Sequence, residues 1–178
     1  MLDMLQRDHR NMARLLDLVE AELDRFAAGE GADLELLADV LDYALNYPDL
    51  IHHPLENAIA RRLSAAEPVE RRGEPDIVAE HKALSQAARS FAAAVAHVSR
   101  EAEMARDDFV RIGRDFVEIN RRHMASEEQL FFPRALARLS DEDWAAIGVE
   151  RRIDDPLFGR KPEQRYLRLV ERLVQRDG

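Results

Sequence analysis

The chain contains no cysteine. This absence excludes disulfides, thiolate nucleophiles, iron–sulfur clusters and cysteine-ligated zinc sites. Lysine is scarce, and the formal net charge of −9 disfavours a nucleic-acid partner, because affinity for nucleic acid depends on neutralising phosphates. No apolar run reaches the ~18 residues of a membrane span. The first residues, MLDMLQRDHR, lack the basic-then-apolar layout of a signal peptide, so we expect a cytoplasmic protein.

Glycine and proline are also few, and they gather at breaks in the chain. The clearest breaks are GEG at 29–31 and EPVERRGEP at 67–75. Between the breaks, apolar residues recur three and four positions apart, which is the period of an amphipathic helix. We therefore predict an all-α fold, with an up-and-down four-helix bundle over residues 1–139.

Residues 140–178 are expected to add two short helices. Ser140 is a suitable N-cap for the first, because the acidic stretch DED follows it. The second is expected to have one apolar face, which packs on the bundle or at a homodimer interface. That predicted face consists of Tyr166, Leu167, Val170, Leu173 and Val174.

Each apolar stripe of the bundle is interrupted by polar residues. A single histidine on an apolar face is usually a hydrogen-bonded core residue, and a single His-x-x-x-Glu pair is usually an exposed ion pair. Buried carboxylates are costly unless they are paired or bind metal, so side chains of these types that meet in one core require a cation. The interrupting residues are His9, His52 and Glu56, His81, and His123 and Glu127.

The spacing of these histidines predicts that they do meet. In an up-and-down bundle, two residues at the same level on consecutive helices are separated by a turn. That turn lies near the midpoint of the sequence between the two residues. The midpoint of His9 and His52 falls in GEG, and that of His52 and His81 falls beside Pro68. The midpoint of His81 and His123 falls at residue 102, where the turn is inferred from the midpoint alone. The layer is expected near the end of the bundle that carries the N-terminus.

Imidazole and carboxylate ligands without thiolate suit iron, manganese or zinc. Four histidines and two glutamates are too many for one tetrahedral zinc, and they suit two ions that share bridging carboxylates. The chain lacks the Glu-x-x-His motif of ferritin-like di-iron bundles; its order is His first and Glu four later.

This pattern resembles the hemerythrin-like (HHE cation-binding) family. The matching motifs are RDHRNM around His9, HHPLE at 52–56, AEHKAL around His81 and RRHMASEE at 121–128. The resemblance implies a four-helix bundle around an oxo- or hydroxo-bridged di-iron centre, in which Glu56 and Glu127 are the bridging carboxylates. It further implies that His9 and His52 bind one iron, and that His81 and His123 bind the other.

One position departs from the pattern of the oxygen-carrying hemerythrins, which have two histidines four residues apart on the third helix. In this chain the first of the two corresponds to His81, and the second position is Ser85. Either His53 supplies the missing donor or water fills the position. Tyr43 and Tyr47 lie close to His52 in sequence, as packing residues or as donors to the ligands. His97 lies too far from His81 along its helix to belong to the site.

The leading hypothesis for function is a di-iron protein that binds, senses or reacts with oxygen, nitric oxide or hydrogen peroxide. The alternatives are an iron-handling or sensing protein without turnover, and a metal-free helical adaptor. Pro48 and Pro54 also predict a kink between residues 47 and 54, because Pro54 cannot donate to the carbonyl of Leu50.

Overall fold

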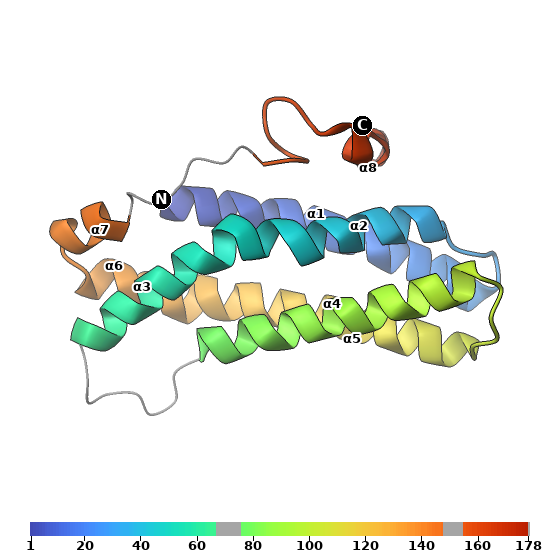
Figure 1. The fold of residues 1–178 in the computed structure, drawn as a ribbon, viewed down its shortest axis with the longest axis horizontal. Helices are drawn as coiled ribbons and strands as arrows, with labels where there is room; N and C mark the ends of the chain where they lie inside the picture. The colour runs from blue at the N-terminus through green and yellow to red at the C-terminus, as the bar shows by residue number, and fades with distance from the viewer. Residues whose placement is uncertain (67–75, 148–154, 178) are drawn as a thin grey trace.

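The computed structural model describes residues 1–66, 76–147 and 155–177. Within these ranges the fold is all-helical and has no β-strand, as predicted. Figure 1 shows the long helices lying side by side along the length of the molecule. None of the helices in the described ranges is long and apolar enough to cross a membrane. The long helices are α1 (Leu2–Ala28), α2 (Leu34–Tyr47), α3 (His53–Ala66), α4 (Ile77–Ser99) and α5 (Arg106–Ser126).

The long helices pack as a closed ring. Helix α5 contacts α1 and α4, α2 contacts α4 and α1, and α3 contacts α4. Two of the predicted turns are present: α1 ends before Gly29, which has a φ of 84°, and α4 ends at Ser99, before α5 begins at Arg106. The predicted break at 67–75 lies outside the described residues. Asp33 and Asp76 cap α2 and α4 by accepting backbone N–H groups of the first helical turn.

The predicted kink between residues 47 and 54 is confirmed as a π-helical turn, η1 (Pro48–His52), between α2 and α3. Figure 1 shows the chain bending where α2 gives way to α3. A second π-helical turn, η2 (Glu127–Phe131), joins α5 to α6 (Phe132–Arg138). The turn η2 was not predicted from the sequence, although Pro133 lies two residues beyond it, as Pro54 lies two residues beyond η1. Such wide turns are frequent at functional sites.

The C-terminal residues contribute helices α7 (Asp141–Ile147) and α8 (Leu167–Asp177), with a 3₁₀ turn, η3 (Gln164–Tyr166), before α8. Ser140 caps α7 as predicted, since its Oγ accepts the backbone N–H of Asp143 at 3.2 Å. Helix α8 packs on α1 and α2. The predicted apolar face was partly wrong, because Leu167 and Val174 are exposed, whereas Leu169 is fully buried.

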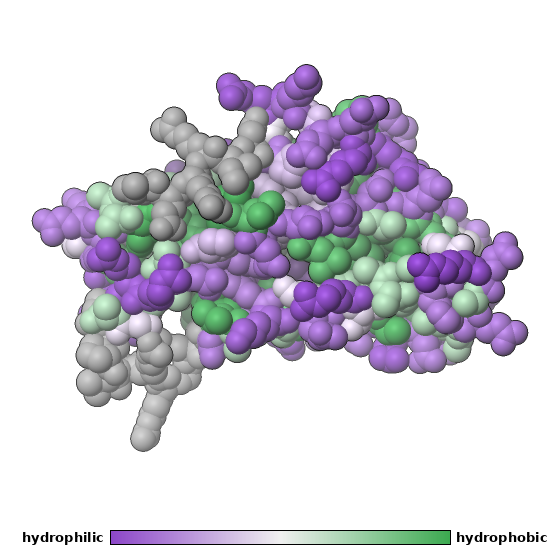
Figure 2. Space-filling view, in the orientation of Figure 1, coloured by the Kyte–Doolittle hydropathy of each residue, from purple (hydrophilic) through white to green (hydrophobic). Residues whose placement is uncertain are grey.

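Charged pairs surround the buried face of α8 and orient it on the bundle. Arg165 and Arg168 reach acidic side chains of α2, and Arg172 reaches Glu22 of α1 at 2.9 Å. Figure 2 shows a mostly polar surface at the top of the molecule, where the C-terminal segment lies, while apolar patches interrupt the polar surface lower on the same face.

The buried apolar side chains form two clusters, and the predicted histidine layer lies between them. The smaller cluster includes Leu5, Ile59 and Phe131, near the N-terminal end of α1. The larger one includes Leu16 and Phe116 and extends to the turns at the other end. The polar layer is therefore covered by apolar packing on both sides, which strengthens electrostatic interactions within it.

Candidate metal centre

The six residues predicted from the sequence lie together in the bundle. Glu56 and Glu127 are fully buried, and the four histidines are 4–6% exposed. The backbone positions follow from the helical period, because residues four apart share a face. His9 comes from α1, His52 from η1, Glu56 from α3, His81 from α4, His123 from α5 and Glu127 from η2.

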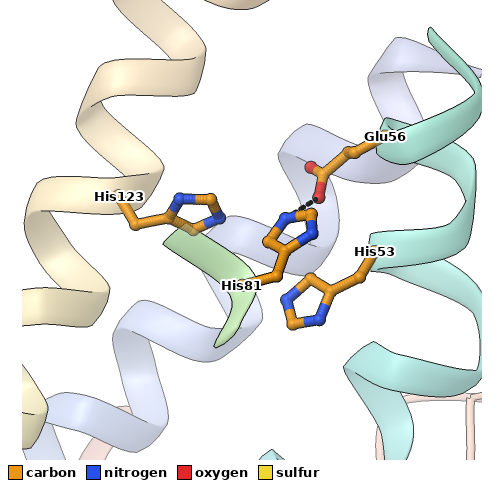
Figure 3. A group of neighbouring side chains, drawn as sticks. All are labelled: His53, Glu56, His81 and His123. Carbon is orange, nitrogen blue, oxygen red and sulfur yellow. Dashed lines mark ion pairs between the residues drawn. The ribbon is translucent and has the colours of Figure 1, made fainter. Parts of the chain in front are cut away.

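Their ligand atoms form two groups, and within each group the atoms lie within 4.8 Å of one another. One group contains His9, His52, Glu56 and Glu127. The other contains His81 and His123 with Glu56 and, in addition, His53. Figure 3 shows His53 and Glu56 extending from one helix towards His81 and His123. The ring of His53 stacks on that of His81, with centroids 3.9 Å apart.

The carboxylate of Glu56 faces both groups. Its Oε1 lies 2.9 Å from Nε2 of His52, and its Oε2 lies 3.2 Å from Nε2 of His81. The Oε2 atom of Glu127 lies 3.2 Å from Nε2 of both His9 and His123. Glu56 therefore belongs to both groups, and Glu127, which belongs to the first group, also reaches His123 of the second.

Four further carboxylates contact the outer nitrogen, Nδ1, of four histidines. Glu80 lies 2.7 Å from Nδ1 of His123, and Asp49 lies 2.7 Å from Nδ1 of His53. Because a carboxylate can only accept, Nδ1 carries the proton and donates it. Partners of this kind fix the tautomer and the ring orientation of metal-binding histidines. The other two pairs are Asp8 with His52 at 3.3 Å and Glu128 with His9 at 3.1 Å.

The inner nitrogen atoms, Nε2, then present lone pairs to one another. Nε2 of His9 and Nε2 of His52 are only 3.2 Å apart, which is unfavourable for two lone pairs without a cation or a proton between them. Among the described residues, both oxygens of Glu56, both oxygens of Glu127 and the Nε2 atoms of His81 and His123 are buried without a hydrogen-bond partner. Buried polar atoms are rarely left in this state. The donor set therefore fits a metal cation at each group.

The charges of the site are strongly coupled. Burial alone would lower the pKa of His52, but Glu56, Asp8 and Glu127 together raise that pKa to about 10. A proton thus takes the place of a cation beside Glu56 when no metal is bound. Burial lowers the pKa of His53 to about 4, so its imidazole is neutral and available as a ligand at pH 7. Burial and the nearby charge of Glu56 raise the pKa of Glu127.

A cavity of about 40 Å³ lies beside the histidines, and its lining includes His52, His53 and His123. A single water molecule needs a cavity volume of ~10–15 Å³, measured in the same way. The cavity therefore has room for a ligand of only a few atoms. Ser85 lines this cavity, together with Tyr47 and Asn120. The cavity was not predicted from the sequence, because its walls come from helices far apart in the chain.

His97, predicted to be unrelated to the site, is indeed remote from it. Its Nε2 contacts the backbone carbonyl of Glu103 at 3.1 Å, in the turn between α4 and α5. It therefore offers a matched control for substitutions of the site histidines.

Comparison with known proteins gives one match. The family model of the hemerythrin HHE cation binding domain matches residues 1–135, which include all seven residues of the two groups. A search of curated proteins and a search of solved structures found no match.

Proposed function

The chain belongs to the hemerythrin HHE cation-binding domain family, and we propose that it holds two iron ions and binds or reacts with a small oxygen- or nitrogen-containing ligand. His9 and His52 would hold one ion, and His53, His81 and His123 the other. Glu56 and Glu127 would bridge the two. The bundle would have up-and-down four-helix topology, which the ring of helix contacts supports.

The observation that carries this proposal is the set of unpartnered, buried ligand atoms. A metal-free adaptor would need a polar layer whose hydrogen bonds are satisfied. Here the four oxygens of Glu56 and Glu127 lack hydrogen-bond partners within the described part of the chain. The nearest polar neighbours of these oxygens are Nε2 atoms of the site histidines. A buried carboxylate that faces such atoms is stabilised only by a cation or by protonation of an imidazole.

The size of the cavity supports a small ligand. Its volume of about 40 Å³ is far below the several hundred Å³ of pockets that hold drug-sized molecules. Oxygen, nitric oxide and hydrogen peroxide all fit this limit. A pair of iron ions with an open coordination position would supply redox and ligand-binding chemistry beside this cavity. The protein would orient the ligands through Asp8, Asp49, Glu80 and Glu128, and would limit access of bulk water.

The proposal is tested by loading the protein anaerobically with ferrous iron and measuring bound metal by elemental analysis. We expect two iron ions per chain, and an absorption change when oxygen, nitric oxide or peroxide is added. His53→Ala should reduce the metal content or the affinity, whereas His97→Ala should bind iron as the wild type does. A chain that takes up no iron, or equal losses in the two variants, would contradict the proposal.

A second candidate function is iron sensing without turnover, and one contact favours it. Asp155, in the C-terminal part of the chain, accepts a hydrogen bond from the Tyr43 hydroxyl at 3.0 Å, and Tyr43 lines the cavity. A change at the metal centre would then alter how residues 155–177 are held. Metal-dependent protease sensitivity of that segment, without any steady consumption of peroxide or oxygen, would favour sensing.

A further inference from the structure

All three tyrosines of the chain lie together, although one of them is distant in sequence. The rings of Tyr43 and Tyr47, both in α2, are stacked with centroids 5.1 Å apart. The ring of Tyr166, just before α8, meets Tyr43 edge-on with centroids 5.8 Å apart. The three rings therefore form one continuous aromatic path, and each is buried to at least nine-tenths of its surface.

The inner end of this path lies at the candidate metal centre. Tyr47 is the last residue of α2 and immediately precedes η1, which ends at His52. Tyr43 and Tyr47 both line the cavity that His52 and His53 also line. Both rings therefore border the same small cavity as the candidate ligands.

The outer end of the path lies at the surface. The Tyr166 hydroxyl donates to Oδ2 of Asp42 at 2.8 Å, and the side chain of Asp42 is 45% exposed. The Arg165 guanidinium contacts the same carboxylate at 3.0 Å and lies over the Tyr166 ring at 4.6 Å. Solvent and small solutes therefore reach the carboxylate of Asp42, to which the buried Tyr166 hydroxyl donates.

Two of the hydroxyl groups donate to a carboxylate, which is the acceptor that oxidation of a tyrosine requires. Tyr43 donates to Oδ2 of Asp155, whose other oxygen is fixed by the backbone N–H groups of Leu157 and Phe158 at 2.8 Å each. Burial raises the pKa of Tyr43, so its hydroxyl stays protonated and can lose an electron only as it gives up its proton. Burial also raises the pKa of Asp155, which makes its carboxylate a better proton acceptor.

Packing alone does not require these hydroxyls. Phenylalanine would fill the same volume without burying a polar group, and burying a hydroxyl is costly unless it is hydrogen-bonded. The chain instead places an acidic residue at the hydroxyl of Tyr43 and another at that of Tyr166. This arrangement suits transfer of a proton together with an electron.

We propose that Tyr47, Tyr43 and Tyr166 carry oxidising equivalents from the metal centre to the surface at Asp42, so that the protein reduces hydrogen peroxide with electrons from an external one-electron donor. The path rests on the proposed function, since it requires a redox-active metal pair at the site. Each peroxide molecule takes up two electrons and two protons and leaves as two water molecules. The donor is a small phenol or ascorbate, which gives up one electron and one proton at each of two encounters.

Within the chain, each step moves one electron and one proton. The O–H bond of Tyr43 breaks, its proton passes to Oδ2 of Asp155, and its electron passes through Tyr47 to the metal centre. Tyr166 then returns an electron to Tyr43, while its own proton passes to Asp42 and that on Asp155 returns to Tyr43. The external donor then gives an electron to Tyr166, and the proton on Asp42 returns to the Tyr166 oxygen. The proton that the donor gives up enters the solvent, and the solvent supplies the protons that peroxide takes up. The tyrosines are thus unchanged after each cycle.

The test uses the full chain loaded with iron, mixed with hydrogen peroxide and frozen within milliseconds for electron paramagnetic resonance. We expect a phenoxyl radical signal that narrows when the protein is made with ring-deuterated tyrosine. In Tyr166→Phe, a tyrosine radical should still form, but ascorbate should no longer accelerate the decay of that radical. Tyr43→Phe should lose both the Tyr166 radical and the response to ascorbate.

Phe158→Leu is the matched packing control, because the Phe158 ring meets the Tyr43 ring edge-on, with centroids 6.0 Å apart, and has no hydroxyl. It should leave the radical and its response to ascorbate intact. If iron binds and peroxide is consumed but no tyrosine radical forms, or if Tyr43→Phe behaves as the wild type, the tyrosine path is wrong and the metal site stands. If no iron binds, both proposals are overturned.

Discussion

Replacing Glu80 by glutamine tests whether the outer carboxylates prepare the histidines for metal. Oε2 of Glu80 lies 2.7 Å from Nδ1 of His123, a buried histidine on the neighbouring helix. Glutamine keeps the length of the side chain and a carbonyl acceptor but removes the charge. Loss of a carboxylate partner of this kind typically weakens metal binding by about 10- to 100-fold. That range corresponds to about 1.4–2.7 kcal/mol of binding free energy.

The structure places the expected effect in the lower part of this range. The Glu80 side chain is 33% exposed, so solvent screens part of its charge, and the glutamine carbonyl still accepts the N–H of His123. Glu80→Ala removes the acceptor as well and should weaken binding further, towards the upper part of the range. The order wild type, glutamine variant, alanine variant is therefore part of the prediction.

Metal affinity is measured by competition against a chelator of known affinity, with circular dichroism to show that each variant is folded. Glu118→Gln is the control, because Glu118 is an exposed acidic residue on α5, the helix that carries His123. It should bind metal as the wild type does. If the affinity of Glu80→Gln is within twofold of the wild type, or if Glu118→Gln is weakened equally, the orienting role of Glu80 is refuted.

Three further predictions follow from the same geometry. Metal at a thousand times its dissociation constant should stabilise the fold by about 4 kcal/mol per site, and thermal melts with and without chelator should differ by roughly 8–16 °C per site. Because the pKa of His52 is raised to about 10 without metal, metal binding at pH 7–9 should release about one proton from each protein molecule. The affinity for metal should therefore rise with pH. Calorimetry in two buffers of different ionisation enthalpy measures the number of protons released. Gly113→Ala should lower the free energy of unfolding by about 1 kcal/mol, as measured by urea melts. The new Cβ would lie 2.5 Å from Cδ2 of buried Leu23, and the cost of this overpacking outweighs the gain in helix propensity from alanine.

The helical fold could be predicted because its determinants are local. Apolar spacing located the long helices, and Gly29 marks the first turn with a left-handed backbone that glycine adopts without strain. The turn after Ser99 was inferred only from the spacing of histidines, and the structure has a turn there without a glycine or proline. It was harder to predict which face of α8 is buried. Leu169 is buried and Leu167 is exposed because of where the bundle lies against the helix, and two leucines so close in sequence do not show this.

The outer carboxylates of the site were missed for a geometric reason. Asp8, Glu80 and Glu128 each adjoin a predicted ligand in sequence, yet each contacts a histidine on a different helix. Neighbouring residues on a helix point about 100° apart, so a carboxylate beside one ligand is directed towards the adjacent helix. Only the pair of Asp49 and His53 has the four-residue spacing of a same-helix contact and could have been found from the sequence.

The order of residues in HHPLE supports the view that His53 is a ligand and that Ser85 borders an open position. Seen down a regular helix, Glu56 lies about 40° from His52 and about 60° from His53, and so between them. A glutamate between two histidines can turn one oxygen to each side, and the distances from Glu56 to His52 and to His81 have that form. The ring of His53 stacks on His81, while Ser85 lines the cavity. In the proposed centre, Ser85 would leave space for a ligand, and His53, the first residue of α3 after the π-helical turn, would supply the donor that serine lacks.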